Sequence, residues 1–310
     1  MSYSQYPNGI SNLIIRGVPL AVSHPGKVFW VNSTSVLPDL GVGGADAPAP
    51  AGGTYLRPFA TIDYAVSQCV ANRGDIIMVM PGHSETISAA TSLVLDVAGI
   101  AVIGLGRGTD RPDLNFTATA GSVEIDAANV LLHNLTLTAD VSAVVVGVNV
   151  DAAGVTLDSL EFTYNATGDD FVTMVDVDAV AGTTISNCKF IAEDTAGCAE
   201  AIRLDTAGNT TIEGNYFYGD FTDGVIIGEG AASTNLLIKD NVLYNSDTTA
   251  GNLVDLNVAC TGIMANNAMG TLFATAPETA VDPGSLLSIE NYVCNAVDES
   301  GALVPTTVST

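Results

Sequence analysis

Arg203 and the carboxylates around it are the residues of this sequence that are best suited to catalytic chemistry. Arg203 lies between two aliphatic residues in a short alternating segment, so its side chain is expected to point away from the apolar face of a strand. Asp176 lies about one repeat unit upstream, Asp205 lies two residues downstream, and Asp255 follows further along the chain. A cation among carboxylates on one face could perform acid–base chemistry. The structural alternative is a surface ion pair in an acidic protein.

The other groups that could do chemistry stand apart in the sequence. His83 and His133 have no serine or cysteine partner at a recognisable nucleophile elbow. Asp169–Asp170 is a doublet of carboxylates, but no histidine follows it closely. The cysteines are widely spaced, so we expect neither a zinc site nor a disulfide framework. They are Cys69, Cys188, Cys198, Cys260 and Cys294.

A repeat of about 26 residues must position these groups. Each copy has three slots, and successive first slots are 25, 28, 27, 26, 26 and 25 residues apart. A fixed period in this range predicts a solenoid. The copies are Leu132, Leu135 and Leu137; Leu157, Leu160 and Phe162; Ile185, Cys188 and Phe190; Ile212, Asn215 and Phe217; Ile238, Asn241 and Leu243; Met264, Asn267 and Met269; and Ile289, Tyr292 and Cys294.

The segments inside each copy are short, rich in β-branched residues and alternating, which predicts strands and not helices. A unit of this length with two or three short strands corresponds to one coil of a parallel β-helix. We therefore expect an all-β solenoid of about 8 to 9 coils. Equal slots of successive coils would lie about 4.8 Å apart. The third slots would form an inward apolar ladder, and Asn215, Asn241 and Asn267 would form an amide ladder.

An acid or amide precedes each copy, usually followed by one or two small residues and then Gly or Asn. These residues are Asp126, Asp151, Asp178, Asp205, Glu229 and Asn257. Asp at a turn accepts a hydrogen bond from its own backbone two residues on, which explains the position structurally. The alternative is a row of Ca²⁺ ligands, for which Asp178 and Asp205 are the candidates. No other cofactor is expected.

The sequence divides into three parts. Residues 1–54 lie outside the repeat and form an arm with an apolar stretch; Leu13, Ile14, Ile15 and Trp30 are its candidate attachment residues. Residues 55–295 form the solenoid, with a short amphipathic helix near 59–72. Residues 296–310 form a tail whose last part, 301–310, is uncharged and β-prone; the tail could cover the C-terminal end or join a neighbour.

The entry to the solenoid resembles a known family. Pro58-Phe-Ala-Thr-Ile62, a short helix, Gly74-Asp75, a strand, Pro81-Gly82 and Glu85-Thr86 resemble the start of pectin-lyase-like right-handed β-helix proteins. The resemblance implies a right-handed parallel β-helix whose N-terminal end is capped by the helix. It spans about residues 55–295. The family contains lyases, hydrolases, esterases and non-enzymatic virus fibre and spike proteins, so the resemblance is specific for fold and not for function.

The resemblance also defines what an enzyme of this kind would require. Its hydrolases combine Asn-Thr-Asp, Asp-Asp, His-Gly and Arg-Ile-Lys motifs, and only Asp169–Asp170 matches here. Its lyases use Ca²⁺-binding acids with an Arg or Lys base, for which Arg203 with Asp176, Asp205 and Asp255 is the best set. Cleavage of a polysaccharide on the outer face is therefore one functional hypothesis. A second is a carbohydrate-binding solenoid, in which Tyr164, Tyr216, Tyr218 and Tyr244 stack on sugars; ordinary strand composition also explains these tyrosines.

The charge composition limits the classes of partner that the protein is expected to bind. The chain has 9 Lys+Arg against 34 Asp+Glu, a net charge of −25. Such a surface repels nucleic acid and anionic membranes. The sequence shows no signal-peptide pattern and no apolar run long enough to span a membrane.

A non-enzymatic virion protein is the function that these features favour. An acidic β-helix with extended arms and few catalytic groups resembles a phage structural protein assembled in the host cytoplasm. Among virion roles we favour a capsid decoration or cement protein that binds the major capsid protein through its terminal arms. Three such solenoids can pack side by side and exchange arms, so we expect a homotrimer.

Overall fold

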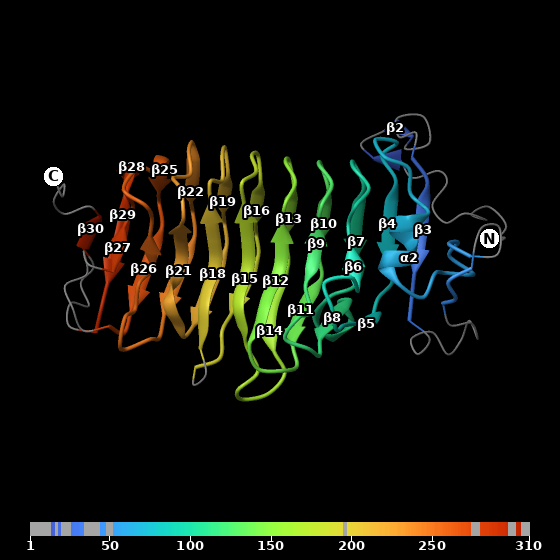
Figure 1. Ribbon diagram of the computed structural model, residues 1–310, viewed down its shortest axis with the longest axis horizontal. Helices are drawn as coiled ribbons and strands as arrows, with labels where there is room; N and C mark the ends of the chain where they lie inside the picture. The colour runs from blue at the N-terminus through green and yellow to red at the C-terminus, as the bar shows by residue number, and fades with distance from the viewer. Residues whose placement is uncertain are drawn as a thin grey trace.

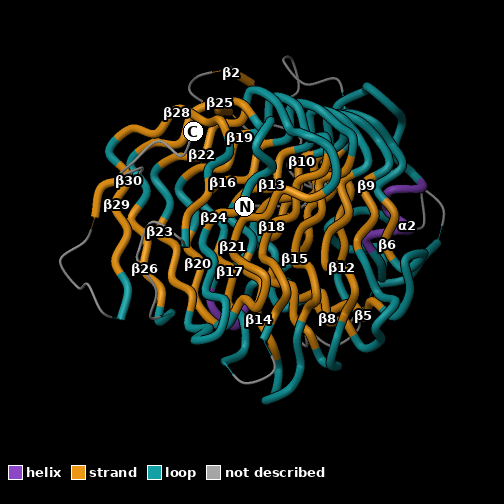
Figure 2. The backbone as a smooth tube through the Cα atoms, turned by 60° about the vertical axis from the view of Figure 1, so that its left-hand side comes forward, coloured by secondary structure: helices purple, strands orange, loops and turns teal. Residues whose placement is uncertain are grey.

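The chain folds into a right-handed parallel β-helix of about eight turns, as the sequence and the family resemblance predicted. The computed structural model describes residues 14–15, 18–19, 26–33, 44–47, 52–194, 197–273, 280–296 and 302–304. Three sheets run along the solenoid, and each regular coil contributes one strand to each sheet (Figure 1). Figure 2 shows these strands as three walls joined by loops.

Within each sheet the strands follow the order of the coils. In the regular coils each strand pairs with the strands three places earlier and three places later in the chain. Sheet I contains β3 (Val28–Val31), β4 (Ile76–Val79), β7 (Ala101–Gly104), β10 (Leu131–His133), β13 (Thr156–Asp158), β16 (Thr184–Ser186), β19 (Thr211–Glu213), β22 (Leu236–Lys239), β25 (Thr261–Ala265) and β28 (Ser285–Ile289). Sheet II contains β5 (Ser84–Ile87), β8 (Asp113–Phe116), β11 (Thr136–Ala139), β14 (Glu161–Tyr164), β17 (Lys189–Ile191), β20 (Tyr216–Gly219), β23 (Val242–Asn245), β26 (Ala268–Thr271), β29 (Asn291–Cys294) and β30 (Ala302–Val304). Sheet III contains β6 (Leu93–Val94), β9 (Val123–Ile125), β12 (Val144–Val150), β15 (Phe171–Asp178), β18 (Cys198–Asp205), β21 (Phe221–Glu229), β24 (Val254–Asp255) and β27 (Val281–Asp282).

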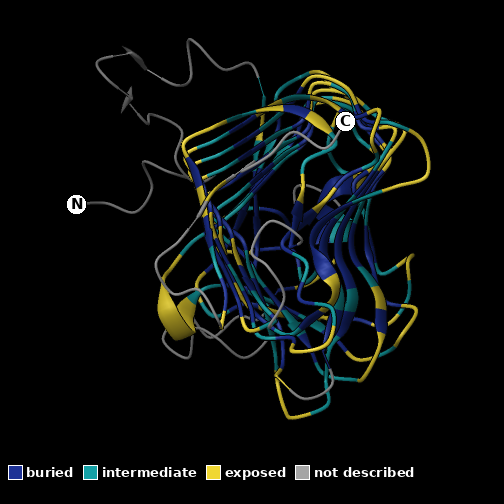
Figure 3. Ribbon diagram, turned by 90° about the vertical axis from the view of Figure 1, so that its left-hand side faces the viewer, coloured by how far each residue is buried: buried dark blue, intermediate teal, exposed yellow. Residues whose placement is uncertain are grey.

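The register confirms the first and third slots of the repeat through Met264 and Met269. In sheet I the first slots pair directly from Leu132 to Met264, and all are buried. In sheet II the third slots pair from Leu137 to Met269. Phe162, Phe190 and Phe217 stack with ring centroids 4.9 and 4.6 Å apart. Figure 3 shows the buried interior that these inward columns fill.

The last copy of the repeat lies one residue earlier in the chain than the sequence pattern predicts. Met269 pairs with Val293, which is fully buried, whereas Cys294 pairs with Gly270 and faces outward. Asn291, and not Tyr292, occupies the amide slot. Because side chains alternate across a strand, an error of one residue reverses inside and outside. The chance placement of Ile289 one repeat after Met264 caused the error, since Met264 pairs with Ser288.

The amide ladder is structural, and it is longer than predicted. Oδ1 of Asn215 accepts a hydrogen bond from the backbone N–H of Cys188 at 2.9 Å. Asn241, Asn267 and Asn291 repeat this contact, each with the backbone N–H of the previous member at 2.9–3.0 Å. Each Nδ2 donates to a carbonyl of the preceding coil. The ladder therefore satisfies buried backbone groups at the corner between sheets I and II.

Two rows of residues with positive φ form the corners between the sheets. One row, between sheets I and II, has φ of 50–66° and consists of Asn134, Ser159, Asn187, Gly214, Asp240, Asn266 and Glu290. The other row, before sheet I, consists of Gly99, Asn129, Gly154, Gly182, Asn209 and Asn235. This is the left-handed region that Gly and Asn adopt most readily. The Gly or Asn that ends the acidic turn in the sequence therefore marks the start of each sheet I strand.

A short helix covers the N-terminal end of the core, as predicted, but it spans only Ile62–Ser67 (α2). Thr61 caps α2 by accepting from the backbone N–H of Tyr64, and Ile62, Ala65 and Val66 are buried. Glu85 of β5 accepts from the N–H of Ile62 at 2.9 Å. Figure 1 shows α2 beside β3 and β4 at this end of the solenoid.

The arm expected over residues 1–54 contains the first strand of the solenoid. β3 pairs in parallel with β4 as the end strand of sheet I. Trp30 is buried against Met78 and Met80, so its indole is not available as an attachment contact. Ile14–Ile15 (β1) pairs with Val18–Pro19 (β2) in an antiparallel hairpin, while Leu13 lies outside the described residues.

The tail expected over residues 296–310 contributes β30, which pairs antiparallel with β29 at the end of sheet II. Leu303 of β30 is half exposed. Among the described residues, no helix has the length and apolar character needed to cross a membrane.

Candidate functional site

Arg203 lies on the outward face of sheet III, as predicted, and Asp176 is its direct strand neighbour. The Nε of Arg203 donates to Asp176 Oδ1 at 3.0 Å, and Nη2 donates to Oδ2. Nη1 lies 3.6 Å from Glu200 and 4.0 Å from Glu229. The guanidinium is therefore held in a fork by one carboxylate and flanked by two more.

This environment fixes the charge of Arg203. The hydrogen bonds that the guanidinium donates to Asp176 raise its pKa above the ordinary value, and burial, which acts in the opposite sense, is outweighed. Glu200 is itself buried and receives a hydrogen bond from Thr173 at 2.5 Å; burial raises its pKa. A guanidinium in this setting is an electrostatic partner for carboxylates and does not release its proton to act as a base.

The other proposed members of this set do not converge on Arg203. Asp205 points outward two residues further along β18 and accepts from Thr206 and from the N–H of Ala231. Asp255 lies two coils away, with Ile227 between it and Arg203 in the same column. Burial and the neighbouring Asp282 raise the pKa of Asp255. The structure therefore joins Arg203 to Asp176 and separates it from Asp205 and Asp255.

The turn acids gather elsewhere than the sequence suggested. Oxygens of Glu124, Asp126 and Asp151 lie within 4.8 Å of one another, whereas Asp178 and Asp205 belong to no such group among the described residues. The Nδ2 of Asn149 bridges Glu124 and Asp151, at 2.8 and 3.0 Å. Glu124 lies directly beside Asn149 in sheet III, so an alignment of successive coils in the sequence could have identified Glu124 as a member of this group. Asn257 makes the predicted backbone bond two residues on, to the N–H of Ala259.

A histidine–aspartate pair on the outward face of sheet I was missed in the sequence. Nδ1 of His133 lies 2.7 Å from Oδ2 of Asp158, its neighbour in the next coil. Ser186 and Asn187, one coil further on, both donate to Asp158 Oδ1 at 2.8 Å. Although burial acts in the opposite sense, the bonds from Asn187, Ser186 and His133 lower the pKa of Asp158. The spacing of one coil between His133 and Asp158 was the signal available in the sequence.

His83 is also paired, but inside the protein. Its Nε2 lies 3.1 Å from Glu85 Oε2, the same oxygen that receives the N–H of Ile62. His83 is fully buried, so this pair ties β5 to the capping helix and has no access to a substrate.

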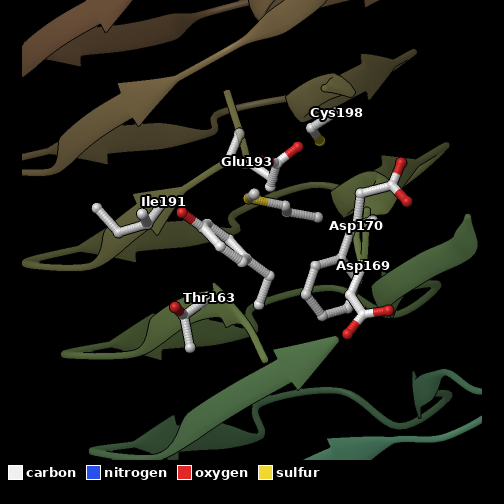
Figure 4. A pocket seen from close by; sticks show the side chains of 10 residues that line it. Thr163, Asp169, Asp170, Ile191, Glu193 and Cys198 are labelled. Atoms are coloured by element: carbon white, nitrogen blue, oxygen red, sulfur yellow. The ribbon is translucent and has the colours of Figure 1, made fainter. Parts of the chain in front are cut away.

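Asp169 and Asp170 line a shallow hollow between two successive coils (Figure 4). Asp170 accepts from the backbone N–H of Ala143, and burial raises its pKa. Glu193 and Cys198 lie at the far side of the hollow. The hollow encloses about 160 Å³, open solvent included, but has no room for a water molecule. The carboxylate doublet therefore does not face a substrate-sized cleft in this structure.

Tyr216, Tyr218 and Tyr244 lie on the outward face of sheet II, whereas Tyr164 is in register with the buried Ala139 on the inward face. Tyr216 and Tyr218 are exposed, as their alternation with Phe217 predicted. Tyr218 and Tyr244 stack on each other with centroids 5.2 Å apart and planes at 13°. Each ring therefore turns one face to the other ring, which leaves less of these two rings for stacking on a sugar. Tyr164 is partly buried against the core.

The comparisons with known proteins bear on the fold. No model of a protein family matches the sequence, and no curated protein matches it. Among solved structures, the chain is similar to one described as "Crystal structure of pectate lyase Pel9A". The identity is 12%, the TM-score is 0.47, and the likeness covers 92% of this chain and 84% of that chain. A likeness at this level supports no conclusion about the activity of this chain.

Proposed function

We propose that this chain is a non-catalytic structural protein of a viral particle, with decoration of a capsid shell as its role. The fork between Arg203 and Asp176 is the observation that carries the proposal, because it commits the best candidate for a catalytic base to an ion pair. A polysaccharide lyase of the kind considered above would need that side chain to accept a proton from its substrate.

The architecture suits a rigid spacer. Inward ladders of phenylalanine and asparagine link the coils from β14 to β29, so this part of the solenoid can project from a surface without bending at a flexible joint. The segments outside the repeat on both sides of the solenoid support the choice of the shell over the tail, because they offer places of attachment. Detection of the protein in purified tails and not in heads would contradict that choice.

Two measurements test the proposal together. Purified particles from the source should contain the chain in many copies, as read by mass spectrometry of gradient fractions. The isolated protein should release no unsaturated or reducing ends from acidic or neutral polysaccharides, with Ca²⁺ or with a chelator. Arg203→Ala should lower the melting temperature through the unpaired acids it leaves, without changing these product assays.

The alternative is a protein that acts on a polysaccharide. It is favoured by the exposed Tyr216 and Tyr218 and by the carboxylate group at Asp151. Cleavage that depends on Ca²⁺ and disappears in a folded Arg203→Ala variant would replace the structural proposal with a lyase. Binding without cleavage, lost in Tyr216→Ala, would favour a carbohydrate-binding solenoid.

A further inference from the structure

The outward face of sheet II changes character along the solenoid. In the coils up to β17 its outward positions include Asp113, Glu161 and Lys189. From β20 to β30 the positions in register with these carry no charged side chain among the described residues. We name this surface the apolar strip. It consists of Tyr216, Tyr218, Val242, Tyr244, Ala268, Gly270, Tyr292, Cys294 and Leu303.

The strip is exposed and continuous. Tyr292 is 54% exposed, Leu303 50% and Val242 45%, and they are close neighbours in one column. The fold does not require apolar residues here, since the same face carries charges in earlier coils. Contiguous apolar surface of this kind on a soluble protein marks a contact with another chain or ligand.

Acids border the strip on both sides. Asp194 is exposed at one side, and Ser246 of a later coil donates to its Oδ1 at 3.1 Å. Asp220 follows β20 on the same side. Asp240 and Glu290, both exposed, form the corner on the other side. A ligand that fits this surface is apolar in the middle and positively charged at its margins.

The N-terminal arm of this chain has that chemistry. Of the 34 acids in the chain, none lies before Asp39. Residues 1–25 contain Arg16 and His24 as their basic side chains. The run from 13 to 22 is Leu-Ile-Ile-Arg-Gly-Val-Pro-Leu-Ala-Val, with Arg16 at its middle. In a protein of net charge −25, this is the apolar segment that the acidic border attracts and does not repel.

The dimensions agree. Five strands spaced by about 4.8 Å make the strip roughly 24 Å long, and four residues make it roughly 13 Å wide. A hairpin of ten residues covers roughly 17 by 10 Å. Within this stretch β1 and β2 pair antiparallel, and they lie at the β3 end of the solenoid, away from the end that carries β26 to β30 (Figure 1). The hairpin of one copy therefore reaches the strip of a neighbour more directly than its own strip.

We propose that the apolar strip binds the N-terminal arm, residues 1–25, of a second copy of this chain. Apolar contacts with the aliphatic run supply the affinity, and the acidic border aligns Arg16. The contact is heterologous, because arm and strip lie at different places on each copy, and it closes into a ring or continues as a chain of copies. It forms from the protein alone, whether or not the protein belongs to a particle.

The first test of the contact is the native mass of the protein. We compare the full chain with a version lacking residues 1–25, by light scattering over a range of concentrations. The deletion removes no described core residue, because the core cluster begins at Phe29. We expect oligomers of the full chain and monomers of the deleted chain. Oligomers that persist after the deletion, or a full chain that stays monomeric, would overturn the proposal.

A peptide of residues 8–25 then locates the contact. It should bind the deleted protein in fluorescence anisotropy, and Val242→Asp or Tyr292→Asp should weaken binding by about tenfold or more. Val145→Asp is the matched control, because Val145 is 57% exposed on β12 of sheet III, away from the strip. An Arg16→Glu peptide should bind more weakly at low salt. Equal binding to all variants would show that the arm binds elsewhere and would overturn the assignment to the strip.

The same variants separate this contact from the proposed particle role and from sugar binding. Strip variants that abolish oligomers while the protein still joins particles would leave the particle role intact. A polysaccharide that binds the deleted protein at Tyr292 with high affinity, while the peptide does not, would assign the strip to carbohydrate and overturn the arm contact.

Discussion

Asn241 shows at the residue scale how one side chain joins three coils. Its Oδ1 accepts from both the backbone N–H and Nδ2 of Asn215, at 2.9 and 3.1 Å. Its Nδ2 donates to Ile212 O and to Asn267 Oδ1, both at 3.0 Å. The side chain is 1% exposed, so water cannot replace these partners. The cost of losing them is therefore set by the desolvation of the groups that remain.

Asn241→Ala should lower the free energy of unfolding by about 2–4 kcal/mol, because it leaves a buried N–H and a buried carbonyl without partners. Urea unfolding followed by circular dichroism measures the change. Asn165→Ala is the control, since Asn165 is exposed and bonds Asp140 at the surface. Its expected effect is below about 1 kcal/mol. Equal losses in the two variants would show that the ladder contributes no special stability.

Asp75 carries a second concentration of hydrogen bonds, at the N-terminal end. Its fully buried carboxylate accepts from Arg73 Nε and Nη2 at 2.7 and 2.6 Å. It also accepts from the backbone N–H groups of Lys27 and Val70 at 2.6 and 2.8 Å. Burial alone would raise the pKa of Asp75, but these bonds outweigh it and hold the pKa below its ordinary value.

The sign of the resulting pH dependence follows from this lowered pKa. The folded state binds the proton more weakly than the unfolded state, so Asp75 stabilises the fold above its unfolded pKa of about 3.9 and loses that contribution as pH falls. Asp75→Asn should therefore lower stability at pH 7 by roughly 3 kcal/mol and by much less near pH 3. Melting temperatures from pH 3 to 7 test this. A deficit that does not shrink towards low pH would contradict the assignment.

At the scale of the elements, the chain turns from sheet I to sheet II at a single residue with positive φ in each of seven coils. Asn and Gly fill four of these seven places, and Ser159, with φ of 57°, is an exception. Residues other than Gly and Asn are less stable in this region of φ and ψ than in the right-handed region. The corner therefore holds a small amount of strain that a single substitution can remove.

Ser159→Asn should raise the free energy of unfolding by about 0.5 kcal/mol, because Asn adopts the left-handed region more readily than Ser. Ser84→Asn is the control, since Ser84 is exposed within β5, and β5 contains no residue with positive φ. The control should be neutral or slightly destabilising. Chemical denaturation of the three proteins gives the comparison, and a destabilised Ser159→Asn would show that the corner prefers the serine hydroxyl.

The elements were predictable from the sequence wherever a slot is both inward and repeated. Phe162, Phe190 and Phe217 could be aligned because a ladder demands similar apolar side chains at one level of every coil. The outward pairs could not, because polar outward positions are not constrained by packing. His133 and Asp158 meet only because the register places them opposite each other, and Ser186 completes the contact from a third coil.

At the scale of the whole molecule, the two ends of the solenoid differ. The N-terminal end is covered by α2 and held by Asp75 and Glu85. The C-terminal coils carry the apolar strip, and β30 is the last strand of sheet II. In the sequence, the first 38 residues contain none of the acids. The two ends of the solenoid therefore differ in how the described residues cover the core.

The amide ladder has a consequence for how this chain is made. Each corner N–H, from Cys188 onward, is satisfied by an asparagine of the following coil and never of the preceding one. A ribosome delivers the coils in order, so the newest coil always waits for residues about 26 positions ahead that have not yet been synthesised. Closure of the corners therefore lags translation by one coil until Asn291 emerges. A chain truncated after Cys188 and before Asn291 would therefore end with a corner N–H that lacks its asparagine partner.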